Sequence, residues 1–231
     1  MKVGKCKICG DTTELTVDHI PQKSLYPKSI RSEVPNMNVI EACSDCNNGG
    51  SGVDEIFKVI VGLIAKPEWA IELEKSVKRT LSANKKLSRQ IDEKTRTEYV
   101  TLANKEIRKA EITKLDGEFR DQFLMAVERC AKAFYYMEFG KVLVEDRDIS
   151  VFHPGAIHPD KNEELQRNLS KSEWKSVNSN TCSYVFVQMD SNDMVFIFKM
   201  YDVVEVHYVI QRIVDLHPKL NDLLERLSCE S

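Results

Sequence analysis

The sequence predicts an α+β protein in three consecutive parts, because cysteine pairs, helical periodicity and strand-like alternation occupy different stretches of the chain. Residues 1–52 are rich in turn residues and contain two closely spaced cysteine pairs. From about residue 53 to residue 143, apolar side chains recur at helical spacing. The later stretches SYVFVQMD, MVFIFKMYD and VVEVHYVI are rich in β-branched and aromatic residues, which predicts a small antiparallel β meander. We therefore expect two units, residues 1–52 and residues 53–231.

Composition limits the class of protein. With 231 residues, of which 42% are hydrophobic and 30% charged, the chain is long enough to bury a substantial core. It contains no uncharged apolar run of about 18 residues, and MKVGKCKICG lacks the apolar segment of a signal peptide. We therefore expect no membrane span and a cytoplasmic location. The net charge of −3 argues against a protein that coats nucleic acid uniformly.

The middle part is predicted to be helical. VDEIFKVIVGLIA places apolar side chains on one helix face, and Pro67 should end or interrupt that helix. Residues 68–115 continue as one or two long polar helices, and Gly117 breaks the pattern before FRDQFLMAVERCAKAFYYMEFG resumes it. Cys130 lies on the apolar face of this last helix and is expected to act as a small buried hydrophobe.

The C-terminal part alternates in the manner of strands, with DSND as a turn between the first two. HPGAIHPDKNEEL is predicted to be a loop by its prolines and glycine, so His153 and His158 are expected to be ordinary loop residues. His207 lies within a strand, and residues 218–227 are expected to form a short closing helix.

Two Cys-x-x-Cys pairs, Cys6/Cys9 and Cys43/Cys46, predict a structural zinc site. They are separated by 33 residues, and each pair can supply two thiolates from a tight turn to one tetrahedral ion. The alternatives are reduced thiols or a redox pair, but a thioredoxin-type motif would need a βαβ context that is missing here. Because four thiolates close the coordination shell, any chemistry would fall to other residues.

The residues between and beside the two pairs resemble the HNH nucleases. TVDHIP carries Asp18 and His19, and NVIEACSDCN begins at Asn38 and ends at Asn47, directly after the second cysteine pair. This pattern is similar to the subgroup of HNH nucleases whose ββα-metal fold is held by two cysteine knuckles, and it covers roughly residues 6 to 50. The resemblance implies that TVDHI and NVIEAC form a hairpin and that a helix begins near Ser44.

The resemblance also implies roles for these residues. His19 would be the general base, since its ordinary pKa lies near neutrality. Asp18 and Asn47 would offer oxygen ligands to a catalytic Mg²⁺ or Mn²⁺. Asn38 would orient the loop that carries His19.

Each role has an alternative. A histidine beside an aspartate is more often a surface or core pair, and Asn47 could instead cap a helix. Asn36 is a nearby alternative to Asn38, as Asn48 is to Asn47.

One departure from the family pattern concerns positive charge. Many HNH nucleases follow the final asparagine with basic residues, whereas this chain continues as NNGGSG. Lys23, Lys28 and Arg31 are the candidates for contacts with substrate phosphates. Residues 75–114 are another candidate for phosphate contacts, since this stretch contains twelve Lys or Arg and five Asp or Glu, a local charge of +7. That stretch could equally be a solvated face or a dimer contact.

We therefore expect a metal-dependent endonuclease that hydrolyses double-stranded DNA, with nucleic acid as its partner. A microbial defence or mobile-element effector is one hypothesis, in which residues 53–231 sense a trigger, bind a partner protein or form a homo-oligomer. The alternatives are an HNH-type ribonuclease and a non-catalytic zinc module that docks on nucleic acid or protein.

Overall fold

The computed structural model describes most of the chain, and every structural statement below concerns the described residues: 2–34, 37–48, 51–64, 67–101, 105, 107–114, 116–143, 147–152, 159–178, 180–190, 193–201 and 204–212. Within them, none of the helices is long and apolar enough to cross a membrane.

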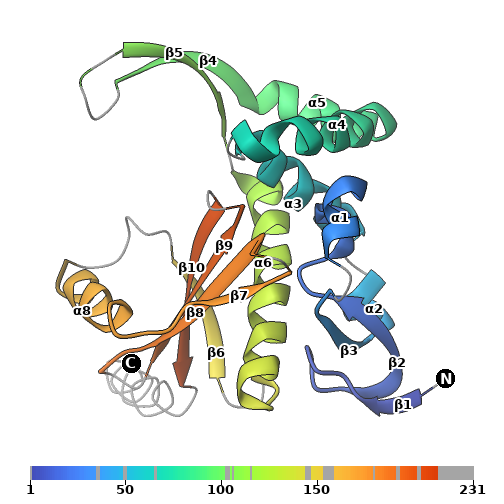
Figure 1. The fold of residues 1–231 in the computed structure, drawn as a ribbon, viewed down its shortest axis with the longest axis vertical. Coiled ribbons are helices and arrows are strands. Elements are labelled where there is room, and N and C mark those ends of the chain that lie inside the picture. The colour runs from blue at the N-terminus through green and yellow to red at the C-terminus, as the bar shows by residue number, and fades with distance from the viewer. Residues whose placement is uncertain are drawn as a thin grey trace, which may run out of the picture.

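The fold is a mixed α+β arrangement around one long helix, α6 (Gly117–Phe139). A three-stranded antiparallel sheet with its short helices lies on one side of α6, and a five-stranded antiparallel sheet lies on the other (Figure 1). The predicted fold class is confirmed at this level.

The N-terminal part is a small sheet of order β1-β2-β3 in which neighbouring strands run antiparallel. The predicted hairpin strands and the helix start at Ser44 are confirmed. Its elements are β1 (Lys2–Lys5), β2 (Thr12–His19), the 3-10 turn η1 (Lys23–Leu25), α1 (Lys28–Glu33), β3 (Val39–Cys43) and α2 (Ser44–Asn48).

The middle part contains helices and a projecting two-stranded ribbon (Figure 1). The prediction of helix through residue 115 was wrong after Lys94, because TRTEYVT and IRKAEIT pair as antiparallel strands. Threonines at alternate positions favour this conformation, and Thr95 Oγ1 lies 2.8 Å from Thr113 Oγ1 across the ribbon. The elements are α3 (Ser51–Ile64), α4 (Pro67–Ala83), α5 (Lys85–Lys94), β4 (Thr95–Thr101), β5 (Ile107–Thr113) and α6.

The C-terminal sheet contains the predicted meander, extended by a strand at each edge. Its order is β6-β10-β9-β8-β7, in which β8, β9 and β10 are the three expected strands. The prediction of a loop through residue 165 was wrong, since α8 begins at Pro159, where proline suits a first helical turn. The elements are β6 (Arg147–Phe152), α8 (Pro159–Leu169), β7 (Lys175–Val177), β8 (Cys182–Gln188), β9 (Met194–Met200) and β10 (Val204–Arg212).

Some predictions lie outside the described residues. They concern the loop histidines and the closing helix, namely His153, His158 and residues 218–227. His207 lies in β10, as expected, and pairs with Phe152 and Ile197.

One apolar core joins the parts, because its buried residues run from Cys6 in the first cysteine turn to Tyr201 beyond β9. The face of α6 toward the five-stranded sheet is aromatic, and the ring of Phe134 stacks on Tyr184 at a centroid distance of 4.3 Å. Cys130 is fully buried on the same helix, as predicted. The N-terminal sheet is therefore packed into the same core as the rest of the described chain.

Gly62 marks a close contact between α3 and α4. A Cβ at this position would lie 2.4 Å from Val77 Cγ2, so the two helices approach more closely than alanine permits. Gly62→Ala is expected to lower the free energy of unfolding by about 1–3 kcal/mol, although alanine is the better helix former.

Gly52 in the same helix is the matched control. A Cβ there meets nothing within 4 Å among the described residues, so Gly52→Ala, in the first turn of the helix, should not lower the free energy of unfolding and should raise it by at most about 1 kcal/mol. Chemical denaturation of both variants measures the difference. Equal stability of Gly62→Ala and wild type would contradict the close approach.

Candidate functional site

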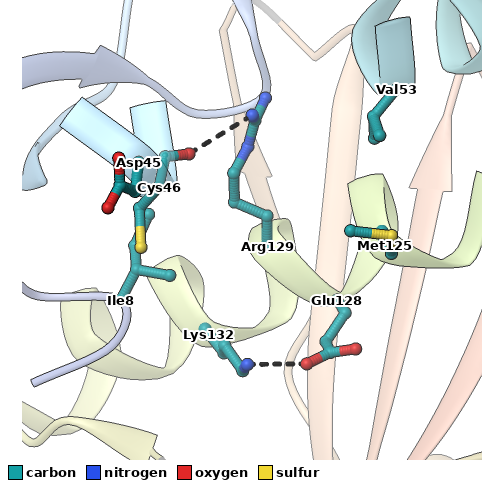
Figure 2. A pocket seen from close by; sticks show the side chains of 8 residues that line it. All are labelled: Ile8, Asp45, Cys46, Val53, Met125, Glu128, Arg129 and Lys132. Atoms are coloured by element: carbon teal, nitrogen blue, oxygen red, sulfur yellow. Dashed lines mark hydrogen bonds and ion pairs between the residues drawn. The ribbon is translucent and has the colours of Figure 1, made fainter. Parts of the chain in front are cut away.

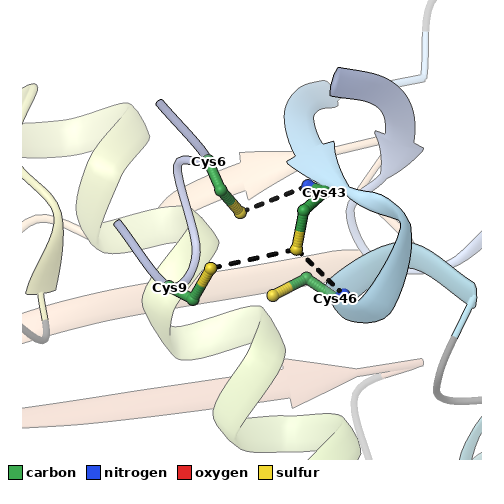
Figure 3. A group of neighbouring side chains, drawn as sticks. All are labelled: Cys6, Cys9, Cys43 and Cys46. Atoms are coloured by element: carbon green, nitrogen blue, oxygen red, sulfur yellow. Dashed lines mark hydrogen bonds between the residues drawn. The ribbon is translucent and has the colours of Figure 1, made fainter. Parts of the chain in front are cut away.

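The four paired cysteines converge on one point and can hold a metal ion such as zinc (Figure 3). Their sulfur atoms all lie within 4.8 Å of one another, and Cys9 Sγ is 3.8 Å from Cys43 Sγ. A tetrahedron with Zn–S bonds of about 2.3 Å has edges of about 3.8 Å, so the spacing fits a four-thiolate site. Four cysteine sulfurs at this spacing therefore have both the donor type and the geometry of a structural zinc site.

Backbone geometry prepares the cysteines for ligation. Gly10 has φ +87°, which lets the chain turn back so that its N–H donates to Cys6 O at 3.0 Å. The N–H groups of Ile8 and Cys43 point at Cys6 Sγ at 3.4 and 3.3 Å. Burial opposes ionisation of Cys6, but backbone hydrogen bonds outweigh it and lower the pKa of this thiol to about 7. Cys6 is thus favoured as a thiolate.

Asp18 and Asn47 lie on the same side of β2. Asn47 Nδ2 donates to Thr16 Oγ1 at 2.9 Å and to Val17 O at 3.1 Å, which fastens the short helix α2 to the strand. Side chains two residues apart in a strand share a face, so Asp18 points to the side that carries Thr16. Within the described residues Asn47 Oδ1 accepts no hydrogen bond from the protein, so it is available as a ligand.

His19 is directed to the other face of the strand. It is the last residue of β2, pairs with Val39 of β3, and is half-buried beside exposed valines at positions 17 and 39. Burial and then the nearby charge of Lys23 lower the pKa of its imidazole. The structure therefore brings Asp18 and Asn47 to one side of the sheet and places His19 at the strand end on the opposite side.

Asp18 is buried against an arginine that the sequence analysis did not identify. Arg129 of α6 donates from Nη2 to Asp54 Oδ1 at 2.6 Å, and its Nε lies 3.9 Å from Asp18 Oδ2. Asp18 is 5% exposed, and its Oδ2 and Arg129 Nε are buried without a hydrogen bond. Burial raises the pKa of Asp18 to about 6, partly offset by the Arg129 charge. Gln22 Nε2 also donates to Asp54 Oδ1, at 3.1 Å.

Removing Arg129 should strongly destabilise the protein. Arg129→Met would leave Asp18 and Asp54 buried without a cation, and the free energy of unfolding is expected to fall by about 3–5 kcal/mol. The double variant Arg129→Met/Asp54→Asn removes one of these charges and should recover part of the loss, measured by urea denaturation. A single variant as stable as wild type would show that the cluster contributes nothing.

A cavity of about 220 Å³ lies between the second cysteine pair and α6 (Figure 2). Arg129 crosses it to reach Cys46 O at 3.5 Å, while Lys132 and Glu128 pair at 2.6 Å on its α6 wall. Neither His19 nor Asn47 lines it. The cavity is therefore separate from the predicted catalytic residues.

The predicted phosphate contacts follow the strand that carries His19. Lys23 and Lys28 are exposed, in the 3-10 turn and at the start of α1. Arg31 is partly buried, and its Nε donates to Tyr26 O at 2.5 Å. The two lysine side chains are thus exposed to solvent, whereas the Arg31 side chain stabilises the turn before α1 through its hydrogen bond to Tyr26.

Asn38 contacts the His19 region through its backbone. Its carbonyl accepts from Ile20 N at 2.9 Å, and its own N–H donates to Asn178 Oδ1 at 3.0 Å. Asn178, 140 residues further along the chain, was missed by the sequence analysis. The alternative Asn36 lies outside the described residues, as does the side chain of Asn48.

Comparison of the chain with models of known families, with curated proteins and with solved structures found no match.

Proposed function

We propose that the chain is an endonuclease of the HNH type, which hydrolyses phosphodiester bonds of DNA with the help of a divalent cation. The observation that supports it most is the hairpin and short helix at the cysteine cluster, which bring Asp18 and Asn47 to one side of β2. His19 follows Asp18 at the end of the strand and is directed to the other face. Zinc in the cysteine cluster would stabilise this arrangement and take no part in the chemistry.

His19 would act as the general base. Its lowered pKa favours the neutral imidazole at neutral pH, the form that accepts a proton from water. Its position at the end of β2, beside the exposed Val17 and Val39, leaves it open to a large substrate. Lys23 supplies a positive charge near this imidazole, where a phosphate would lie.

Asp18 and Asn47 would hold the divalent cation, which supplies positive charge at the phosphate and at the departing oxygen. Both offer hard oxygen ligands, and Asp18 Oδ2 lacks a hydrogen bond in the described structure. Among the described residues, Arg129 is the cation that pairs with Asp18, at 3.9 Å. Binding of a cation therefore requires the guanidinium to shift away from Asp18 while it keeps Asp54.

A second candidate is a non-catalytic docking module held by zinc. It is favoured by the burial of Asp18 against Arg129, which is typical of a structural ion pair, and by the opposite orientation of His19. In that case the exposed face with Val17 and Val39 would contact nucleic acid or protein without cleaving it.

Cleavage of supercoiled plasmid separates these proposals. Purified protein with Mg²⁺ or Mn²⁺ is expected to nick and linearise the plasmid, and EDTA should abolish the reaction. Retention of plasmid in a gel shift without cleavage under either metal would support the docking module instead. Faster cleavage of a structured RNA than of duplex DNA would make the enzyme a ribonuclease.

A further inference from the structure

The turn between β7 and β8 reaches across the molecule to the end of the hairpin that carries His19. Asn178 lies at this turn, is 6% exposed and has φ +51°, a left-handed conformation that asparagine tolerates. Its carboxamide makes three hydrogen bonds with segments more than 130 residues away: it accepts from Asn38 N at 3.0 Å and donates to Ile20 O at 3.2 Å and Tyr26 Oη at 2.8 Å.

These contacts place the Asn178 carboxamide between the two strands of the hairpin. His19 pairs with Val39 in the ladder, so the next residues to face each other are Ile20 and Asn38. Ile20 N donates to Asn38 O at 2.9 Å, which is one of the two bonds of an antiparallel pair. Asn178 replaces the other bond, because Asn38 N donates to its Oδ1 while its Nδ2 donates to Ile20 O.

The turn that presents Asn178 is itself held firmly. Thr181 Oγ1 donates to Asn178 O at 2.7 Å, and Tyr201 N donates to Thr181 O at 2.8 Å. The Tyr201 hydroxyl also donates to Leu25 O at 3.1 Å. Asn178 and Tyr201, both next to strands of the C-terminal sheet, therefore hold the segment that follows His19 at two places: Asn178 at Ile20 and Tyr26, and Tyr201 at Leu25.

We propose that Asn178 is a positioning residue that fixes His19 relative to the phosphodiester to be cleaved. The planar amide of Asn178 offers an acceptor to Asn38 N and a donor to Ile20 O, and so takes the place of the missing strand bond. These hydrogen bonds hold the backbone that follows His19 and couple it to the C-terminal sheet. The catalytic part of this inference rests on the proposed nuclease function, whereas the part that concerns the hydrogen bonds of Asn178 to the hairpin does not.

Asn178→Gly tests the inference, since glycine keeps the left-handed backbone and removes the three hydrogen bonds. The matched control is Asn180→Gly, in the same turn at φ +63°, where the side chain is exposed. We expect Asn178→Gly to lower kcat for plasmid cleavage at least about tenfold with KM and zinc content unchanged. Asn180→Gly should behave as wild type.

Amide hydrogen exchange of the full-length protein, followed by NMR, provides a readout independent of activity. The amides of Ile20 and Asn38 should exchange about tenfold faster in Asn178→Gly than in wild type. Wild-type exchange at both amides, or a wild-type kcat, would overturn the inference. If wild-type protein cleaves nothing, the proposed function fails and the catalytic part of the inference with it, while exchange still decides whether Asn178 holds the two strands together.

Tyr26→Phe keeps the inference testable if Asn178→Gly does not fold. It removes only the hydroxyl that accepts from Asn178 Nδ2 and leaves both strand contacts in place. Faster exchange at Ile20 and Asn38, by about threefold, is expected because the carboxamide loses its third anchor. Unchanged exchange in this variant would contradict the role of Asn178.

Discussion

Cys43→Ser is expected to lose the bound metal and to unfold the N-terminal sheet. Cys43 ends β3, is 7% exposed, and its sulfur lies beside Cys9 Sγ and accepts from Cys46 N at 3.3 Å. Structural zinc contributes on the order of 10 kcal/mol to the folding of small zinc modules, as much as the whole stability of a typical domain. Because the N-terminal sheet shares the core of α6, the loss should lower the thermal stability of the whole described fold.

Elemental analysis and thermal unfolding measure this effect. Wild-type protein should contain about one zinc per chain, and Cys43→Ser should contain almost none. Asp45→Asn is the control, because Asp45 is an exposed neighbour within the same cysteine turn and offers no thiolate. A wild-type protein that keeps its unfolding temperature after the metal is stripped would refute a structural metal.

His19→Ala is expected to abolish DNA cleavage while the fold and its zinc remain. His19 is half-buried at the end of β2, so its truncation to alanine removes little buried surface. Loss of a general base lowers kcat by about 10²- to 10⁴-fold, whereas DNA affinity, carried by lysines such as Lys23, should hardly change. Nicking rates of supercoiled plasmid and a gel-shift titration measure the two quantities separately.

Val17→Ala is the matched control for His19→Ala. Val17 lies on the same face of β2, two residues before His19, and is 61% exposed. It should cleave at the wild-type rate. Cleavage by His19→Ala at that rate would refute the assigned base even if the protein is a nuclease.

The N-terminal elements could be predicted because local signals agree there. Each cysteine pair needs a tight turn to bring its two thiols to one ion, and TVDHI and NVIEAC are rich in the β-branched residues of strands. Ser44 and Asp45 are residues that favour the start of a helix. The cysteine cluster follows from spacing alone, and the structure brings its four sulfurs together. Local sequence features were therefore sufficient to predict the strands, the helix start and the cysteine cluster of the N-terminal part.

The ribbon of β4 and β5 was missed because charged residues that favour helix, five of its fourteen, are interspersed with its threonines. Lysines, arginines and glutamates between Thr95 and Thr113 are good helix formers, and they conceal the period-two placement of Thr95, Thr97 and Thr101. The edge strands β6 and β7 were missed for another reason. Each is short or lies next to residues with loop signals, and only pairing with β10 and β8 makes them strands.

The site residues from other parts of the chain could not be predicted from local patterns. The local pattern predicts only that Asp54 is a polar residue near the start of a helix and that Asn178 is a turn residue. For Arg129 the sequence does contain one indication of a buried ion pair. Arg129 shares a helix face with Ala126 and Ala133, which are both fully buried, and a charged side chain among small buried residues needs a partner of opposite charge. That its partners are Asp54 and Asp18 follows only from the packing of α6 on the N-terminal part.

The most direct test of the catalytic site is a crystal of the protein soaked in Mn²⁺, with its anomalous scattering measured. A manganese peak is expected at bonding distance, about 2.1 Å, from oxygen atoms of both Asp18 and Asn47, with Arg129 turned away from Asp18 but still bound to Asp54. Manganese that avoids both residues, while Arg129 stays beside Asp18, would contradict the proposed cation site and with it the assignment as a nuclease.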